Sequence, residues 1–233
     1  MAEGATVVAE ARDARARVEA RYVVAGTDDP VIDAALALGV RVYDLAPGVM
    51  EKIADTVTPQ PVLAVVGSST LTLEDLRAPL LNGGFVVVGA DVRDPGNAGT
   101  LIRSAEGSGA CGVVLCAGSV ETTNPKTVRA SAGAIFHVPV IAGEAPASVL
   151  GWLGRLGVRR WGTAANDAGA TDYDKAQLTG PTALVLGNEA HGLPEGVDVD
   201  GFLSIPMAGR TESLNVAMAT AVVCFEAARQ RRG

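Results

Sequence analysis

The sequence has few residues of the types that usually carry redox chemistry, metal binding or base stacking. Its 233 residues include three cysteines, two histidines and 4% aromatic residues. No Cys-x-x-Cys pair and no cluster of histidines, cysteines and acids at metal-ligand spacing is present, so we expect neither a disulfide framework nor a metal site. The low aromatic content argues against single-strand binding on a platform of stacked rings.

Positive charge and long apolar runs are also scarce. The net charge is −7 and the sequence pI is near 4.9, which argues against a nucleic-acid binder that relies on bulk positive charge. A polyanionic partner would need a local basic patch, which the net charge does not reveal. There is no apolar run of about 18 residues and no basic-then-apolar leader, so we expect neither a membrane span nor secretion. Unpaired cysteines fit a reducing cytoplasm.

Alternating apolar strands and helical segments favour two α/β units. Apolar residues make up 48% of the chain and charged residues 19%, which is typical of a folded protein with a substantial core. In residues 1–66 we expect a parallel layer, with helices over 7–20, 30–38 and 47–57 and strands over 23–25, 40–43 and 61–66. The first helix begins almost at Met1 with no strand before it, which predicts a unit truncated at its N-terminus.

Residues 67–84 are polar and glycine-rich, and we expect a linker there with a short helix over 73–81. Residues 85–233 are expected to form the second unit. Its strands are predicted over 85–90, 112–116, 135–140, 159–164, 182–186 and 203–205, and its helices over 97–108, 124–132, 147–156 and from 214 onward. Asn97 and Ser213 are predicted to cap the first and last of these helices. The spacing predicts one helical face formed by Leu214, Ala217, Met218, Ala221, Val222 and Phe225.

Several common catalytic motifs are absent or misplaced. The pattern Gly-x-Gly-x-x-Gly occurs at residues 107–112, where it ends a helix and enters a strand. A dinucleotide-binding motif must follow a strand and open a helix, so we interpret these glycines as helix C-caps. The sequence contains neither a phosphate-binding Gly-x-x-x-x-Gly-Lys-Ser/Thr loop nor a Gly-x-Ser-x-Gly elbow.

Three loops that each follow a predicted strand carry the remaining polar residues, over 94–103, 187–193 and 205–215. Loops at the carboxyl ends of parallel strands gather at one edge of the sheet and build a site there. Taken singly, each loop also fits an ordinary connection, because Asn97 can merely cap, Arg103 can merely pair with an acid and Glu189 can merely solvate its loop.

Together the loops resemble a known family. The pattern reads Asn97-x-Gly99-x-x-x-Arg103, then Leu186-Gly187-x-Glu189-x-x-Gly192, then Ile205-Pro206-Met207-x-Gly209-x-x-x-Ser213-Leu214-Asn215, with Arg129-Ala130-Ser131-Ala132-Gly133-Ala134 between the first two. These segments match the motifs of the SpoU (TrmH-like) RNA ribose 2′-O-methyltransferases of the SPOUT superfamily. The resemblance covers about residues 85–230. Residues 1–66 are similar, more loosely, to the small α/β RNA-binding domain often found in front.

The resemblance implies a fold, a cofactor and partners. It implies a C-terminal SPOUT α/β domain with a deep trefoil knot, S-adenosylmethionine as methyl donor, and a homodimer that binds ribosomal or transfer RNA across both subunits. No metal is required, because the sulfonium methyl is already activated. The implied cofactor-binding residues are Thr163, Ala164, Gly187, Asn188, Gly192, Ile205, Met207 and Leu214.

The residues implied to surround the reacting ribose are Asn97, Arg103, Glu189, Ser213 and Asn215. The family's candidate base is Arg103, but a guanidinium releases a proton only with great difficulty. Our hypothesis is therefore that Arg103 stabilises negative charge developing on the 2′ oxygen and holds an RNA phosphate. Despite the acidic net charge, a local patch can bind phosphates, and we expect it to comprise Arg93, Lys126, Arg129 and Arg210.

Two alternatives stay open at this point. One is a catalytically silent RNA-binding or assembly protein that retains the fold, against which the intact motif residues argue. The other is a methyltransferase that acts on a base, against which the combination of Arg103 with Ser213-Leu214-Asn215 argues. The sequence leaves open which RNA and nucleotide would be modified, and whether the role is housekeeping or antibiotic resistance.

Overall fold

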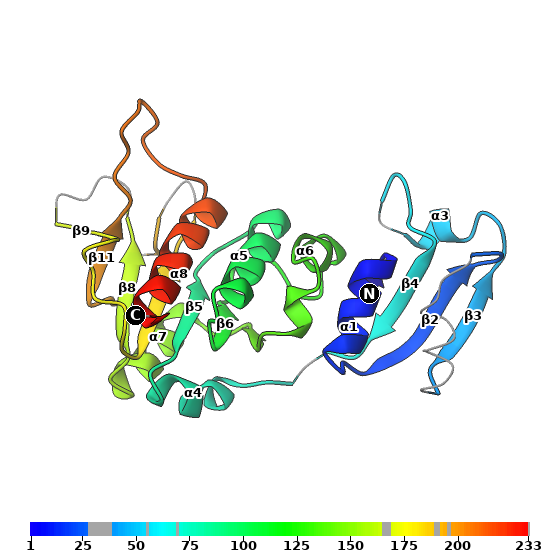
Figure 1. The fold of residues 1–233 in the computed structure, drawn as a ribbon, viewed down its shortest axis with the longest axis horizontal. Coiled ribbons are helices and arrows are strands. Elements are labelled where there is room, and N and C mark those ends of the chain that lie inside the picture. Colours follow the sequence, from blue (N-terminus) through cyan, green and yellow to red (C-terminus); the bar gives the residue numbers. More distant parts are fainter. Residues whose placement is uncertain are drawn as a thin grey trace.

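The computed structural model describes residues 1–27, 39–54, 56–68, 70–164, 169–188, 192–194 and 197–232. These residues form two separate sheets, one of four strands and one of seven (Figure 1). No helix in these ranges has the length and apolar character needed to cross a membrane.

The four-stranded sheet is built from residues 2–66 and is mixed. Its elements are β1 (Ala2–Glu3), α1 (Ala5–Asp13), β2 (Val18–Val24), β3 (Arg41–Leu45), α3 (Met50–Ile53) and β4 (Val62–Val66). In the order β1-β4-β2-β3, β2 and β3 are parallel, whereas β4 is antiparallel to both β1 and β2. The predicted parallel layer was therefore wrong, because helix-strand alternation does not reveal the direction in which a later strand enters.

Three details of this unit also differ from the sequence-based prediction. A strand, β1, does precede the first helix, and Gly4 turns the chain between them with a φ of 96°. The helix predicted over 7–20 ends at Asp13, because Arg15 adopts a left-handed φ of 56° and the chain reverses into β2. The third helix shrinks to the four residues of α3, and the helix predicted over 30–38 lies outside the described residues.

The seven-stranded sheet is parallel throughout. It follows η1 (Leu73–Leu76) and α4 (Arg77–Leu81), and its elements are β5 (Phe85–Gly89), α5 (Pro95–Gly107), β6 (Gly112–Leu115), α6 (Pro125–Ala130), η2 (Ala134–Phe136), β7 (Val140–Ala142), α7 (Pro146–Arg155), β8 (Arg159–Thr163), β9 (Thr171–Asp172), β10 (Thr182–Leu186), β11 (Gly201–Ser204) and α8 (Val216–Arg232). The order is β7-β6-β5-β10-β8-β11-β9, and every pair is parallel, as expected for this unit.

Helices cover both faces of this sheet. Apolar residues of α5 and α8 pack on one face, and those of α7, η1 and α4 pack on the other (Figure 1). All five residues of β5 and of β10 are buried. Central parallel strands are covered on both faces, which explains why their sequences are continuous apolar runs rather than alternating ones.

The strand predicted over 135–140 was wrong. Residues 134–136 form the short helix η2, which follows Gly133 at a left-handed φ of 93°, and β7 begins only at Val140. Pro139 has no N–H to donate to a ladder, which keeps the preceding residues out of the sheet. The interpretation of the glycines at 107–112 as a helix end was right, since Gly109, with a φ of 79°, directly follows the last turn of α5.

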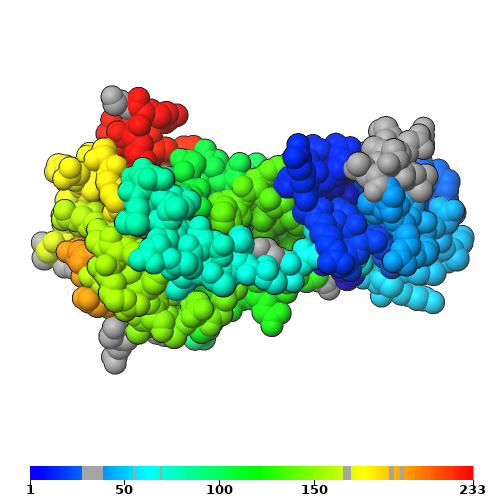
Figure 2. Space-filling model, turned by 90° about the horizontal axis from the view of Figure 1, so that it is seen from below, coloured from blue at the N-terminus to red at the C-terminus, as the bar shows by residue number. Residues whose placement is uncertain are grey.

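The two units meet at α6 and η2 (Figure 2). Val128 and Phe136 pack on the apolar cluster of the first unit. An ion pair from Arg129 to Glu3 at 3.2 Å crosses this contact, as does a hydrogen bond between His137 Nε2 and Glu10 Oε2 at 2.8 Å. A cavity of about 540 Å³ lies beside it, so the contact between the units is only partly filled by side chains.

Candidate active site

The carboxyl ends of four neighbouring strands define the candidate site. Leu186 at the end of β10 pairs with Gly89 at the end of β5, and Thr163 at the end of β8 pairs with Leu203 in β11. The loops that follow these strands therefore leave the sheet at the same edge. This confirms that the three motif loops start at one edge of the sheet, although they lie far apart in the sequence.

The first loop runs from β5 into α5. The N-cap of α5 is Asp94, whose Oδ1 accepts a hydrogen bond of 2.8 Å from the Asn97 backbone N–H, so the prediction that Asn97 caps this helix was wrong. An acid followed by Pro-Gly could have revealed this, since proline favours the first helical position and the cap precedes it. The Asn97 side chain instead accepts a hydrogen bond of 3.1 Å from Asn215 Nδ2, across 118 residues of chain.

The third loop runs from β11 to α8, and Asn215 holds its far end. Asn215 Oδ1 accepts a hydrogen bond of 2.9 Å from the backbone N–H of Ala217 in the first turn of α8. This side chain therefore caps the helix, and the prediction that Ser213 does so was wrong. One amide group thus performs two tasks, because its oxygen caps α8 while its nitrogen binds the first loop.

Before that cap, the third loop is open. Residues 206–213 are exposed, and within the described residues no backbone group of residues 205–214 has a backbone hydrogen-bond partner. Ile205 is partly buried against the core, Leu214 is half-buried and Met207 is 37% exposed. The loop thus combines apolar side chains at its two ends with backbone donors and acceptors that are available to a ligand.

The second loop begins with an antiparallel bridge between Asn188 and Gly192, and Gly187, Asn188 and Gly192 are called the glycine hairpin below. Asn188 and Gly192 exchange two backbone hydrogen bonds of 2.8 Å each. A Cβ on Gly187 would overlap the carbonyl of Gly192, so only glycine fits there. Asn188 Nδ2 donates to the backbone oxygen of Asp91 at 3.2 Å, which ties the hairpin to the first loop. The predicted catalytic residue Glu189 lies outside the described residues.

The other predicted cofactor-binding residues lie at the same edge. Thr163 is the last residue of β8 and Ala164 follows it directly; both are half-buried, and the Ala164 N–H donates to the carbonyl of Leu203 at 3.1 Å. Gly187 is buried at the end of β10, and Gly192 is exposed. The chain thus brings the predicted residues of β8, β10 and β11 together through strand pairing alone.

Arg103 is placed differently from Asn97, although both lie on α5. Six residues of helix separate them, which corresponds to about 9 Å along the axis and about 120° around it. Arg103 is exposed and forms no hydrogen bond or ion pair with the described part of the chain. Four residues further on, Gly107 lies beside Phe225 of α8. Arg103 therefore belongs to the outer face shared by α5 and α8.

The four predicted RNA-binding residues are not equivalent. Arg93 is 72% exposed and pairs with Asp91 at 2.7 Å, and Lys126 lies 3.8 Å from Asp94. Both lie next to the first loop, and Arg210 lies in the exposed third loop. Arg129, in contrast, is 25% exposed and pairs with the buried Glu3 of the first unit.

The sequence analysis did not predict a structural role for Asp172 at this edge. Asp172, in β9, accepts hydrogen bonds from Lys175 at 2.6 Å and from Ser204 at 3.2 Å. The hydrogen bond from Lys175, followed by that from Ser204, holds the pKa of Asp172 below its ordinary value. Among the described residues, no group of three or more His, Cys, Asp or Glu side chains could hold a metal ion.

Comparison with known proteins agrees with this geometry. Residues 84–225 match the model of the SpoU rRNA methylase family, and residues 1–64 match that of an MRM3-like substrate-binding domain. A 23S rRNA (guanosine(2553)-2′-O)-methyltransferase of Bacillus subtilis is 34% identical over 200 residues, which are 85% of this chain and 77% of that protein. A 23S rRNA (guanosine-2′-O-)-methyltransferase of Pectobacterium atrosepticum is 34% identical over 221 residues, which are 91% of this chain and 90% of that protein.

Among solved structures, the SpoU methyltransferase AviRb of Streptomyces viridochromogenes in complex with the cofactor AdoMet superimposes with a TM-score of 0.86. It is 28% identical, and the match covers 99% of this chain and 90% of that one. The family model alone spans more than half of the sequence, and it includes all three loops at the sheet edge. The chain belongs to the SpoU rRNA methylase family.

Proposed function

We propose that the protein transfers a methyl group from S-adenosylmethionine to the 2′-hydroxyl of a ribose in RNA. Ribosomal RNA is the favoured substrate, because relatives that match most of the chain are named as 23S rRNA 2′-O-methyltransferases. The observation that carries the proposal is the Asn97–Asn215 hydrogen bond beside the glycine hairpin. It joins the first and third loops at the edge where the second loop emerges.

The residues at this edge fit the proposed cofactor. The backbone groups of the third loop, which have no backbone partner among the described residues, can bind the polar edge of an adenine, and Ile205 and Leu214 offer apolar contacts for its faces. The missing Cβ of Gly187 lets the hairpin backbone approach closely. Thr163, Ala164, Asn188, Gly192 and Met207 complete the proposed binding set. The cofactor supplies a methyl group already activated by its sulfonium charge.

The proposed role of Arg103 is electrostatic. A ribose hydroxyl becomes nucleophilic as it loses its proton, and a guanidinium stabilises the oxygen charge that develops while it also binds a neighbouring phosphate. Arg103 is exposed, and no carboxylate among the described residues pairs with it, so its guanidinium is available to a phosphate or ribose oxygen. Asn97 and Asn215 position the two loops, and Ser213 and Glu189 complete the proposed ribose site.

The outer face of α5 and α8 supports a proposed homodimer. Met218 and Phe225 of α8 are 58% and 49% exposed, although the predicted helical face included both. The buried residues of α8 instead include Val216, Thr220 and Val223. Large apolar side chains on this scale of exposure favour a protein partner, and a second copy seated here would bring Arg103 into the interface.

The remaining architecture is proposed from the family. We assign residues 1–66 to a small RNA-binding domain, 67–84 to a linker and 85–233 to a SPOUT domain with a C-terminal trefoil knot. We assign the protein to the cytoplasm. The first domain contacts the second through Glu3 of its four-stranded sheet and Glu10 of α1. Phosphate contacts are proposed for Arg93, Lys126 and Arg210, whereas the ion pair of Arg129 with Glu3 favours a role in holding the two domains together.

The test is methyl transfer from labelled S-adenosylmethionine to total RNA that lacks its own modification. Digestion to nucleosides identifies both the RNA and the atom, and a 2′-O-methylated nucleoside from ribosomal RNA is the expected product. Label in transfer RNA would identify transfer RNA as the substrate, and label on a base would identify a base-directed methyltransferase. If the protein binds cofactor and RNA but transfers no label, it is a silent binding protein.

Arg103 variants test the chemistry. Arg103→Lys keeps the charge but loses the forked donors, and we expect methyl transfer to fall by about 10² with cofactor affinity unchanged. Arg155→Lys, on the exposed end of α7, serves as the matched control. Near-full turnover of the Arg103→Lys variant would refute both the base and the forked-donor roles.

A further inference from the structure

The chain between β10 and β11 crosses over β8. The three strands are parallel, and β8 lies between the other two, so residues 187–200 must return from the carboxyl edge of the sheet to its amino edge. Such crossovers usually contain a helix, but the described residues of this one (187–188, 192–194 and 197–200) contain none. The crossover therefore depends on side-chain contacts for its position.

Apolar contacts hold the middle of the crossover against the sheet. Leu193, Val197 and Val199 are partly buried against the cluster formed by α7 and the strands beneath it. Leu193 lies directly over β8, because a Cβ on Gly162 would come within 2.7 Å of its Cδ1. Apolar packing of this kind limits the distance of the chain from the sheet but specifies its register weakly.

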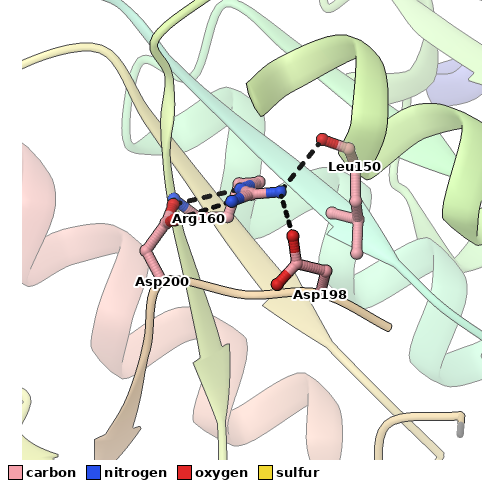
Figure 3. Close-up of polar contacts among 4 residues, drawn as sticks. All are labelled: Leu150, Arg160, Asp198 and Asp200. Carbon is pink, nitrogen blue, oxygen red and sulfur yellow. Dashed lines mark hydrogen bonds and ion pairs between the residues drawn. The ribbon is translucent and has the colours of Figure 1, made fainter. Parts of the chain in front are cut away.

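Arg160 of β8 holds the C-terminal end of the crossover, at Asp198 and Asp200 (Figure 3). Its Nε and Nη2 donate to the two carboxylate oxygens of Asp200 at 3.0 and 2.6 Å. The Arg160 backbone N–H also donates to Asp200 Oδ2 at 2.8 Å, and the Asp200 backbone N–H donates to the Arg160 carbonyl oxygen at 2.8 Å. Nη1 donates to Asp198 at 3.1 Å and to the carbonyl of Leu150 in α7 at 3.4 Å. The Arg160 side chain is only 11% exposed, whereas Asp198 and Asp200 are 82% and 39% exposed, so the arginine is buried while water reaches its two carboxylate partners.

The N-terminal end of the same crossover is the glycine hairpin of the candidate active site. Gly187 and Gly192 lie at the start of the stretch that Arg160 anchors, and Asn188 ties the hairpin to the first loop. We propose that Arg160 is a positioning residue, which sets the register of the crossover and thereby the shape of the hairpin that receives the cofactor. This inference rests on the proposed function for the identity of the ligand, but its structural part does not.

Arginine is suited to this task because its donors form a rigid plane. Three of its nitrogens reach two carboxylates and a helix carbonyl at the same time, so α7, β8 and the crossover are held in one arrangement. Lysine could satisfy one carboxylate but could not fix its orientation. The arrangement predicts that charge without the planar fork is insufficient.

Two variants and one control test the proposal. Arg160→Gln removes the charge, and Arg160→Lys keeps it without the fork. The control is Arg77→Gln, which removes a solvent-exposed arginine–carboxylate pair, Arg77–Glu74, outside the crossover. The measurements are the dissociation constant for S-adenosylmethionine, hydrogen exchange of a peptide covering residues 187–193 in the ligand-free protein, and the steady-state constants.

For both Arg160 variants we expect faster exchange in residues 187–193 and a dissociation constant and KM for the cofactor raised about ten-fold. The affinity for RNA stays unchanged, because the proposed phosphate contacts of Arg93, Lys126 and Arg210 lie outside the crossover. The Arg77→Gln control changes neither measurement. If Arg160→Gln does not fold, Asp200→Asn, which keeps the shape of the partner, is measured in its place.

A lower melting temperature with unchanged exchange and unchanged cofactor affinity would overturn the proposal and leave Arg160 a purely structural residue. Full recovery of both measurements in Arg160→Lys would overturn the requirement for a planar fork. Failure of the proposed function has a different outcome, since the wild-type protein itself would then bind no S-adenosylmethionine. Faster exchange at the hairpin of the Arg160 variants would still support the positioning role in that case.

Discussion

Replacing Gly99 with alanine is the sharpest test of the packing that positions α5. This helix carries both Asn97 and Arg103, and at Gly99 its backbone lies close against α6. A Cβ at this position would overlap the Cβ of Ala130 and would lie 2.7 Å from the carbonyl oxygen of Thr127. Because one of these atoms is backbone, no change of rotamer relieves the overlap, and the two helices must separate.

The size of the effect follows from two opposing terms. Alanine in place of glycine favours a helix by about 1 kcal/mol. Overpacking costs about 1–3 kcal/mol, and contact with backbone favours the upper end of this range. We therefore expect Gly99→Ala to lower the free energy of unfolding by about 2 kcal/mol, which for a chain of this size lowers the melting temperature by about 4–8 °C.

Gly107→Ala is the matched control on the same helix. Its Cβ would meet only the Phe225 ring, at 3.7 Å, which is an ordinary van der Waals contact. We expect its melting temperature to stay constant or to rise by up to about 4 °C. Calorimetry of both variants, with methyl-transfer rates below the melting range, measures stability and the displacement of α5. A Gly99→Ala variant that melts at or above the wild type would refute the argument, as would equal losses in both variants.

Four further outcomes are expected. Asn215→Ala removes the α8 cap and the bond to Asn97, and calorimetry and kinetics should show a loss of about 1 kcal/mol in stability together with a lower kcat/KM. Hydrogen bonds from Arg160 hold the pKa of Asp200 below its ordinary 3.8. The charged pair therefore stabilises the folded protein above that pH, and its contribution is lost as the pH falls through the folded-state pKa. The stability of Asp200→Asn should accordingly depend less steeply on pH in an acid-unfolding experiment. Burial raises the pKa of Cys111 to about 11 and that of the other two thiols to about 12, so thiol labelling at pH 8 should be slow in the folded protein and fast in denaturant. Binding of substrate RNA should weaken steeply with added salt, and a flat response in a titration would contradict docking through phosphates.

The acidic net charge is compatible with the last of these outcomes. Exposed basic side chains lie beside the candidate site, with Arg93 next to the first loop and Arg210 in the third. Their attraction for phosphates is local, because charges separated by more than about 10 Å are largely screened at ordinary ionic strength.

The sequence was sufficient to predict the central strands and the place of the site. Continuous apolar runs such as those of β5 and β10 occur where a strand is covered on both faces, so burial alone marks them. Polar and glycine-rich segments directly after such strands indicate the carboxyl edge of a parallel sheet. The three motif loops were found in this way, and family membership followed from their order.

Only the tertiary structure decided what depends on distant partners. The antiparallel entry of β4, the short helix η2 and the contact of Arg129 with Glu3 leave no periodic pattern in the sequence. The pair of Asn97 with Asn215 joins residues 118 positions apart. Local capping rules assigned the wrong cap to both α5 and α8, because they use only neighbours along the chain. Hydrophobic patterning is a local property of the chain, whereas a side-chain hydrogen bond is specific only once the strand order has brought its two partners within reach.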